Sequence, residues 1–191
     1  MKKLIALYSP APQSGKTTIA TYLEYQCGFR RVGFAGPVRQ LAVDLIQRCG
    51  GLDLVTALDY VSRNKTRPIA QLPSAPTARH LMQVIGTELG RQCISPNFWV
   101  EIWKRKIEAA FEAGRWVVCD DLRFVNEARA VLALGGECWR VTRPGCTSSP
   151  EVLAHVSEGG LEDWPFDAYI NNSGTLNDLH QAIDHQLITT P

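Results

Sequence analysis

The sequence predicts an α/β protein in which a parallel sheet of about five strands is flanked by helices. Short apolar runs of strand length alternate along the chain with longer segments whose apolar residues recur at helical spacing. One run, Trp116 to Cys119, is apolar throughout, which is typical of a strand buried on both faces of a parallel sheet. The 191 residues are enough for one well-cored domain with a small insertion, and too few for two full-sized domains.

The first part of the chain is expected to alternate strand and helix. Pro37 occupies the favoured first turn of a helix, and Gly50 with Gly51 ends that helix. In chain order we expect strand 4–9, a helix behind Lys16, strand 29–35, a helix from Pro37 to Gly50, and a short helix at 54–61.

The second part continues the alternation. Thr77 opens a helix whose apolar face includes Leu81, Val84, Ile85 and Leu89. The elements after it are a helix at 98–113, strand 116–119, a helix at 126–134, strands 137–142 and 168–171, and a final helix capped by Thr175 and Asp178.

Composition excludes several classes of protein. A net charge of +1 gives no global attraction for nucleic acid. The six cysteines form no Cys-x-x-Cys pair and the four histidines show no metal spacing, so neither zinc nor a disulfide framework is expected. No apolar stretch approaches the roughly 20 residues that span a bilayer. We therefore expect a cytoplasmic protein with no membrane partner.

A phosphate-binding loop follows the first strand. Pro10 to Thr17 matches the P-loop pattern, with strand before and helix behind, except that Pro10 stands where the motif has glycine. Gly15 lets the backbone approach a phosphate, Lys16 reaches the β and γ phosphates, and Thr17 offers its hydroxyl to Mg²⁺. We expect a nucleoside triphosphate to bind at Gln13, Ser14, Gly15, Lys16, Thr17 and Thr18. The alternative is an accidental Ser-Gly-Lys-Thr turn.

Two carboxylates, Asp120 and Asp121, follow the apolar run at 116–119. Ligands of parallel sheets collect at the carboxyl ends of the strands, so these side chains are expected beside the metal and the transferring phosphate. A guanine-reading Asn-Lys-x-Asp motif is absent, which excludes a switch GTPase and leaves a small phosphotransferase.

Four segments carry a family resemblance. They are Arg79–Arg91 with Trp99 behind it, Asp121–Glu127, His155–Glu158 and Ile170–Leu176. In this order they resemble the bacteriophage deoxynucleoside monophosphate kinase family. The resemblance implies a P-loop NTPase fold of the nucleoside monophosphate kinase type, with ATP and Mg²⁺ as cofactors. It also implies a location in the host cytoplasm if a phage encodes the chain.

The resemblance implies roles for individual residues. Lys16, Asp120, Asp121 and Arg123 would be catalytic, with Thr17 and Asp121 as metal ligands and with Asn126 and Glu127 bracing the loop. Asn171 and Asn172 would lie near the adenine. The acceptor would be bound by Arg39, Arg79, Gln83, Glu88, Arg91 and Arg143. Structural roles as ion-pair partners or helix caps stay open for Glu88, Asn126 and Glu127, as does plain surface charge for Arg143.

The same resemblance divides the chain. We expect a single P-loop kinase domain over 1–191, an acceptor-binding insertion at about 52–95, and a short lid at about 143–166 that contains His155–Glu158.

Two acceptors stay open. A related branch of phage kinases phosphorylates the hydroxymethyl group of 5-hydroxymethyluracil in DNA, and the Ser9–Thr18 loop is more similar to that branch. An alcohol must lose a proton, which the Asp120 and Asp121 pair permits, and the basic loop at 63–67 could hold a DNA backbone. We therefore expect DNA carrying a modified pyrimidine as the acceptor. The alternatives are a free deoxynucleoside monophosphate, and a non-catalytic ATP-binding module that regulates a partner.

Overall fold

The computed structural model describes residues 3–146 and 160–189. The chain divides into two compact units. The sheet unit comprises Met1–Gly33 and Trp103–Pro191, and the helical unit comprises Phe34–Ile102. The expected division into one kinase domain with an insertion and a lid stays a prediction, and residues 147–159 of that lid lie outside the described residues.

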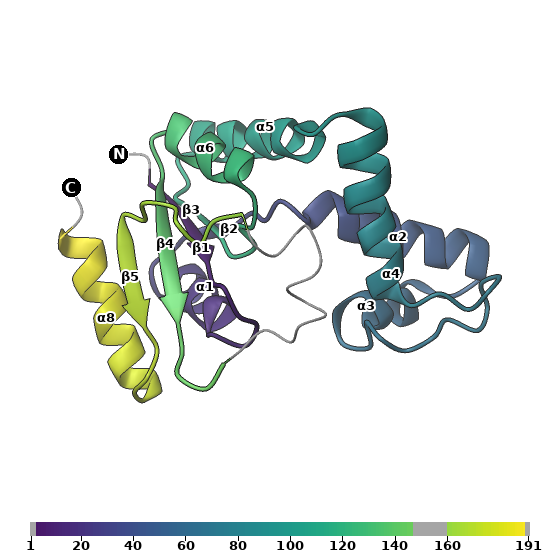
Figure 1. The fold of residues 1–191 in the computed structure, drawn as a ribbon, viewed down its shortest axis with the longest axis horizontal. Helices are drawn as coiled ribbons and strands as arrows, with labels where there is room; N and C mark the ends of the chain where they lie inside the picture. Colours follow the sequence, from purple (N-terminus) through teal and green to yellow (C-terminus); the bar gives the residue numbers. More distant parts are fainter. Residues whose placement is uncertain (1–2, 147–159, 190–191) are drawn as a thin grey trace. The chain divides into compact units, whose positions relative to one another are not determined.

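The sheet unit contains a five-stranded parallel sheet (Figure 1). Its strands are β1 (Leu4–Tyr8), β2 (Arg30–Arg31), β3 (Val117–Cys119), β4 (Glu137–Thr142) and β5 (Ala168–Asn171). Their order is β2-β3-β1-β4-β5, and every neighbouring pair is parallel. The fold class predicted from the sequence is confirmed. The order makes β1 the central strand, so the segment after it leaves from the middle of the sheet.

Helices cover both faces of this sheet. The apolar residues of α1 (Lys16–Gln26) and α8 (Leu176–Thr189) share a buried cluster with Ile5 and Leu7 of β1. Successive strand residues point to opposite faces, so Leu4 faces the other side. On that side, Gly136 lies close to both Leu4 and Val131: a Cβ added to Gly136 would be 2.7 Å from Leu4 Cγ and 2.9 Å from Val131 Cγ1. Val131 belongs to α6 (Val125–Ala133), so α6 packs on this second face of the sheet.

Strand β2 is shorter than predicted. The weak alternation of residues 29–35 predicts seven strand residues, whereas the structure pairs only Arg30 and Arg31 with β3. Val32 still donates its N–H to Val118 at 2.9 Å, and the Val32 carbonyl accepts from Trp103 Nε1 at 3.0 Å. The Val32 carbonyl is thus bonded to the Trp103 indole and not to the backbone of β3, and the chain leaves the sheet after Val32.

The helical unit is built from α2 (Gly36–Gly50), α3 (Leu54–Ser62), α4 (Ala78–Gln83) and the π-helix η1 (Val84–Ile94), with the first turn of α5 (Phe98–Glu112). Asp53 caps α3 by accepting the N–H of Thr56 at 2.9 Å, and Thr77 caps α4 by accepting the N–H of His80 at 3.2 Å. Helix α2 contacts α3, α4 and η1. Its buried residues Val38, Ala42 and Ile46 form the centre of this unit's core.

The π-helix changes which residues are buried. Helical spacing places Ile85 and Leu89 on one apolar face, but only Ile85 is buried and 47% of Leu89 is exposed. The widened turn of a π-helix moves residues four apart away from a common face. Trp99 fills the space beside η1: its indole N–H donates to Gly86 at 2.7 Å, and a Cβ on Gly90 would overlap the indole ring. The burial predicted for Leu89 is wrong for this reason.

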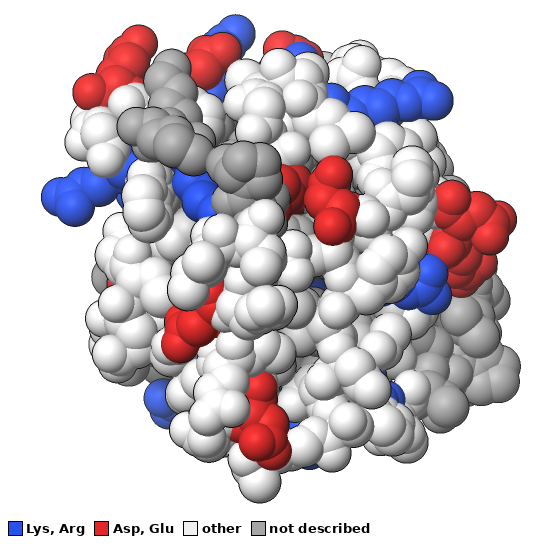
Figure 2. Space-filling view, turned by 90° about the vertical axis from the view of Figure 1, so that its left-hand side faces the viewer, with Lys and Arg blue, Asp and Glu red and all other residues white. Residues whose placement is uncertain are grey.

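Over the described ranges, no helix combines the length and the apolar composition needed to cross a membrane. Figure 2 shows one face of the molecule, on which basic and acidic side chains are interspersed. That pattern agrees with the net charge of +1.

Candidate active site

The loop after β1 forms a turn that ends at the start of α1. The Ser9 hydroxyl donates to the carbonyl of Ala11 at 2.8 Å and accepts the Ala11 N–H at 3.2 Å, so it closes the turn across Pro10. Gly15 has a φ of +105°, which a residue with a side chain adopts only with strain. Its carbonyl accepts the N–H of Ile19 at 3.0 Å and so begins α1.

Ser14 lies at the base of this loop. Its side chain is 2% exposed, and among the described residues no hydrogen-bond partner reaches its hydroxyl oxygen. A buried hydroxyl without a protein partner is costly, so a hydrogen-bonding ligand or a water molecule would stabilise this site. The first turn of α1 contains no acidic residue, which keeps the positive end of the helix dipole available. Both features are compatible with an anion bound at this loop.

Asn172 contacts the same loop. Its side-chain Nδ2 donates to the Ser14 carbonyl at 2.9 Å, although the two residues are 158 positions apart. Asn171, the last residue of β5, is exposed. The loop after β5 is thus brought to the P-loop, and Asn172 touches protein backbone there.

Asp120 is held in a partly buried ion pair. Its carboxylate accepts from Arg31 Nε at 3.0 Å and also pairs with Nη2 of the same guanidinium. Asp120 is 8% exposed and the side chain of Arg31 is 30% exposed. Burial alone lowers the pKa of Arg31, but hydrogen bonding and charge from Asp120 raise its pKa overall. Asp120 is therefore fixed by β2.

Asp121 occupies a different environment. A Cβ on Gly33 would lie 2.6 Å from Asp121 Oδ2, so the carboxylate fits only because residue 33 has no side chain. Asp121 Oδ1 accepts from the thiol of Cys119 at 3.2 Å. Beside this carboxylate, burial and the charge of Asp121 raise the pKa of Cys119 well above its usual value, so that sulfur is a neutral thiol.

The phosphate loop and Asp121 share one edge of the sheet. Strands β1 and β3 are adjacent and parallel, with Ala6 opposite Cys119. The P-loop follows β1 and Asp121 follows β3, so both lie at the carboxyl ends of neighbouring strands, where α/β proteins bind ligands.

Glu127 orders the segment that carries Arg123. Its carboxylate is 2% exposed and accepts the backbone N–H groups of Arg123 at 2.8 Å and Phe124 at 3.1 Å. The Arg123 side chain is exposed, and Asn126 lies in the first turn of α6. Glu127 therefore braces this loop through these two backbone hydrogen bonds, as the resemblance implies.

Arg143 lies in a turn that returns to the P-loop. The Cys146 N–H bonds the Arg143 carbonyl at 3.3 Å, and the Cys146 thiol donates to the Gln13 carbonyl at 3.6 Å. Arg143 is exposed. The turn after β4 is therefore joined to the loop after β1.

The remaining acceptor-side residues belong to the helical unit. Arg39 lies on α2, Arg79 and Gln83 on α4, and Glu88 and Arg91 on η1. Helix α2 contacts both α4 and η1, so these five residues lie on one cluster of packed helices. Arg91 Nη1 donates to the Pro96 carbonyl at 3.3 Å, whereas the other four side chains are exposed.

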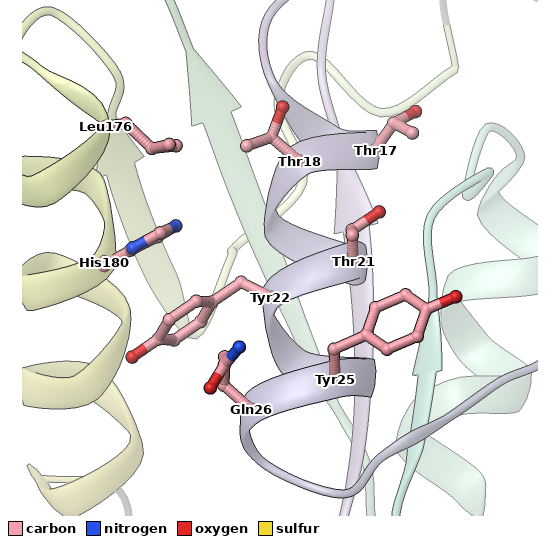
Figure 3. A pocket seen from close by; sticks show the side chains of 8 residues that line it. All are labelled: Thr17, Thr18, Thr21, Tyr22, Tyr25, Gln26, Leu176 and His180. Carbon is pink, nitrogen blue, oxygen red and sulfur yellow. The ribbon is translucent and has the colours of Figure 1, made fainter.

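A cavity of about 740 Å³ lies between α1 and α8 (Figure 3). The P-loop residues Thr17 and Thr18 line one part of it, and Leu176 and His180 of α8 line another. Tyr22 stacks on His180 with ring centroids 4.0 Å apart and donates its hydroxyl to Asp184 at 2.8 Å. The cavity is large enough for the nucleoside part of a nucleotide.

Sequence reasoning missed two residues of this region. Arg31 was expected only as part of a strand, and Gly33 only as a strand residue. The only available signal is a pair of charged residues, Arg30 and Arg31, within a predicted strand, and nothing local connects Arg31 with Asp120. The expected lid segment His155–Glu158 lies outside the described residues.

Comparisons with known proteins identify the family of the chain. The sequence profile of the family "Deoxynucleotide monophosphate kinase" matches residues 53–183. The deoxynucleotide monophosphate kinase of Enterobacteria phage T4 is 29% identical over 133 residues, which cover 69% of this chain and 54% of that kinase. The match thus spans about half the length of the T4 protein. A putative deoxynucleotide monophosphate kinase of Acanthamoeba polyphaga mimivirus is 27% identical over 179 residues, or 89% of each chain.

Among solved structures, a dephospho-CoA kinase from Campylobacter jejuni aligns over 98% of this chain and 96% of its own, with a TM-score of 0.49 and 12% identity. At that score the likeness supports no argument about this chain. The profile match covers well over half of the sequence and confirms the resemblance seen in its motifs. The chain belongs to the deoxynucleotide monophosphate kinase family.

Proposed function

We propose that this protein transfers the γ-phosphoryl group of ATP to a deoxynucleoside monophosphate and so forms the diphosphate. Membership of the family supports the reaction class. The observation that carries the proposal is the anion-ready loop at Ser14 and Gly15, at the same sheet edge as Asp121. A triphosphate bound at this loop extends toward a carboxylate, as phosphoryl transfer requires.

On the donor side, the loop supplies positioning and charge. Gly15 allows the backbone N–H groups at the start of α1 to approach the β phosphate. Lys16 neutralises charge on the β and γ phosphates, and the Ser14 hydroxyl gains the partner that it lacks among the described residues. The nucleoside part of ATP extends from Thr17 and Thr18 into the cavity beside α8.

The residues at this edge suit Mg²⁺, which prefers oxygen ligands and is commonly held by one or two carboxylates together with substrate phosphates. Thr17 offers a hydroxyl and Asp121 a carboxylate. The part of the chain that the structure describes contains no cluster of three or more His, Cys, Asp or Glu side chains that could hold a metal ion. We therefore propose that protein groups and substrate phosphates hold the ion together. When bound, the ion neutralises the charge that develops on the transferring group.

On the acceptor side, arginines are the expected ligands, because a monophosphate is already an anion. Arg39, Arg79 and Arg91 of the helical unit provide three guanidinium groups on contacting helices. Arg123, on the loop ordered by Glu127, stabilises charge on the phosphoryl group in the transition state. Arg143 adds positive charge beside the P-loop.

The DNA-directed alternative remains a prediction. It rests on the similarity of the Ser9–Thr18 loop to the DNA-directed branch, and the aspartate pair permits it because one carboxylate could bind Mg²⁺ while the other removes the proton. The guanidinium of Arg31 engages Asp120, which makes this division of roles between the two carboxylates less favourable. A free deoxynucleotide, which needs no general base, is therefore the better-supported acceptor.

The test replaces the P-loop lysine. Lys16→Ala should reduce phosphoryl transfer by more than about a hundredfold while leaving the unfolding transition unchanged. Lys106→Ala, an exposed lysine on α5, is the matched control and should retain full activity. Full activity in Lys16→Ala would refute the proposal.

The acceptor is identified by supplying labelled ATP with either free deoxynucleoside monophosphates or a duplex containing 5-hydroxymethyluracil. Label in diphosphates supports the proposed reaction, and label in the polymer overturns it in favour of the DNA-directed kinase. Binding of ATP with no transfer to either acceptor would instead favour the regulatory module.

A further inference from the structure

The contact between Asn172 and the P-loop has an unusual geometry for a residue expected near the adenine. Its amide Nδ2 is 2.9 Å from the Ser14 carbonyl oxygen. Since a carbonyl only accepts hydrogen bonds, the amide nitrogen must be the atom that faces it. A Cβ on Gly15 would overlap this nitrogen and lie 3.4 Å from Asn172 Cγ. The amide therefore lies directly against the Gly15 Cα.

This bond determines the orientation of one peptide plane. The described chain contains no cis peptide bonds, so the Ser14 carbonyl and the Gly15 N–H point in opposite directions from their shared plane. Because Asn172 holds the carbonyl on its own side, the Gly15 N–H is directed to the other side. Gly15 follows this peptide plane and precedes the first residue of α1, and its φ of +105° lets the chain turn from the loop into the helix.

Asn172 is itself firmly anchored. Its backbone N–H donates to the Thr142 carbonyl at the end of β4, at 2.7 Å. Three residues later, the backbone N–H and hydroxyl of Thr175 both donate to Asp178 at 2.8 Å and fix the start of α8. The donor amide thus projects from a segment held by the sheet on one side and by a capped helix on the other.

We propose that Asn172 is a positioning residue that sets the Ser14–Gly15 peptide plane, so that the Gly15 N–H is preorganised to bind a phosphate of the donor nucleotide. The inference rests on the proposed function only in naming a nucleotide as the ligand. The orientation of the peptide plane applies to any polyphosphate bound at the loop. It assigns Asn172 to the phosphates, whereas the family resemblance places it near the base. Preorganised donors bind more strongly because the loop loses no freedom on binding.

The experiment compares ATP with Mg²⁺-tripolyphosphate, a ligand that has phosphates and no base. Isothermal titration calorimetry on the full chain should show that Asn172→Ala weakens both ligands equally, by about five- to tenfold. The ratio of ATP to GTP affinity should stay as in the wild type. Lys16→Ala, measured in parallel, shows that tripolyphosphate binds at the P-loop.

Asn177→Ala is the matched control, since Asn177 is exposed in the first turn of α8. Its affinities should equal those of the wild type. Thermal unfolding is recorded for every variant, and Asn172→Ser provides a second test: its shorter side chain should not span the distance to Ser14, so it should show the same loss.

Loss of ATP affinity with unchanged tripolyphosphate affinity would overturn the inference, because Asn172 would then act on the base. Unchanged affinity for both ligands would also overturn it. If the wild type binds tripolyphosphate, the variants lose it and no deoxynucleotide is phosphorylated, the inference stands and the proposed function fails.

Discussion

The guanidinium of Arg31 is paired with the carboxylate of Asp120, 89 residues away in the sequence. The pair joins β2 to the end of β3, and it gives the two adjacent aspartates different environments. Asp120 is fixed by a cation, whereas Asp121 lies beside a glycine and a neutral thiol. We therefore predict that Asp121 contributes to the chemistry and that Asp120 supports the structure.

Removing Arg31 should destabilise the protein, because a mostly buried carboxylate loses its counter-charge. Arg31→Ala is expected to lower the free energy of unfolding by about 1–3 kcal/mol, between the values for exposed and fully buried pairs. Urea denaturation measures the change. Arg30→Ala, at the exposed neighbouring position, is the control and should shift stability little; equal effects of the two substitutions would contradict the assignment.

The two aspartates should respond in opposite ways to amide substitution. Asp121→Asn is expected to lower kcat by about a hundredfold or more, because Asp121 is the carboxylate proposed to hold Mg²⁺, with an unfolding free energy within about 0.5 kcal/mol of wild type. Asp120→Asn should lower stability more and kcat less. Steady-state kinetics and urea denaturation on both variants test this division, which fails if Asp120→Asn shows the larger kinetic loss.

Gly33→Ala should act through Asp121. The added Cβ would lie 2.6 Å from Asp121 Oδ2, so the carboxylate must move. We expect kcat to fall by roughly tenfold or more, with a smaller change in KM, since misplaced catalytic groups are costly. Adding Gly33→Ala to Asp121→Asn should cause almost no further loss of kcat, because the two substitutions act on one group. Independent, multiplying losses would argue against this coupling.

Asp178 should make the stability of α8 depend on pH. Hydrogen bonds from the Thr175 backbone and hydroxyl lower the pKa of Asp178 below its ordinary value. A carboxyl whose folded-state pKa is lowered contributes stability above its unfolded pKa and loses it as pH falls through the folded pKa. Asp178→Asn should therefore melt below the wild type at pH 7. The difference in Tm should shrink below pH of about 4, and a constant difference would contradict this explanation.

Some of this protein was decided by short stretches of sequence. The parallel sheet and the phosphate loop follow from apolar runs, a Gly-Lys-Thr turn and helix signals, each of which acts over a few neighbouring residues. The joint location of the loop and Asp121 also follows, because the carboxyl ends of parallel strands meet at one edge.

Tertiary structure alone decided the long-range contacts on which the proposed roles of these residues depend. Arg31 meets Asp120 across 89 positions and Asn172 meets Ser14 across 158, and no local pattern records either pairing. The exposure of Leu89 likewise depends on a π-helix that packs against Trp99. Periodicity tells which residues share a face of a regular element, but the partner of a polar group is selected only when the strands and helices come together in space.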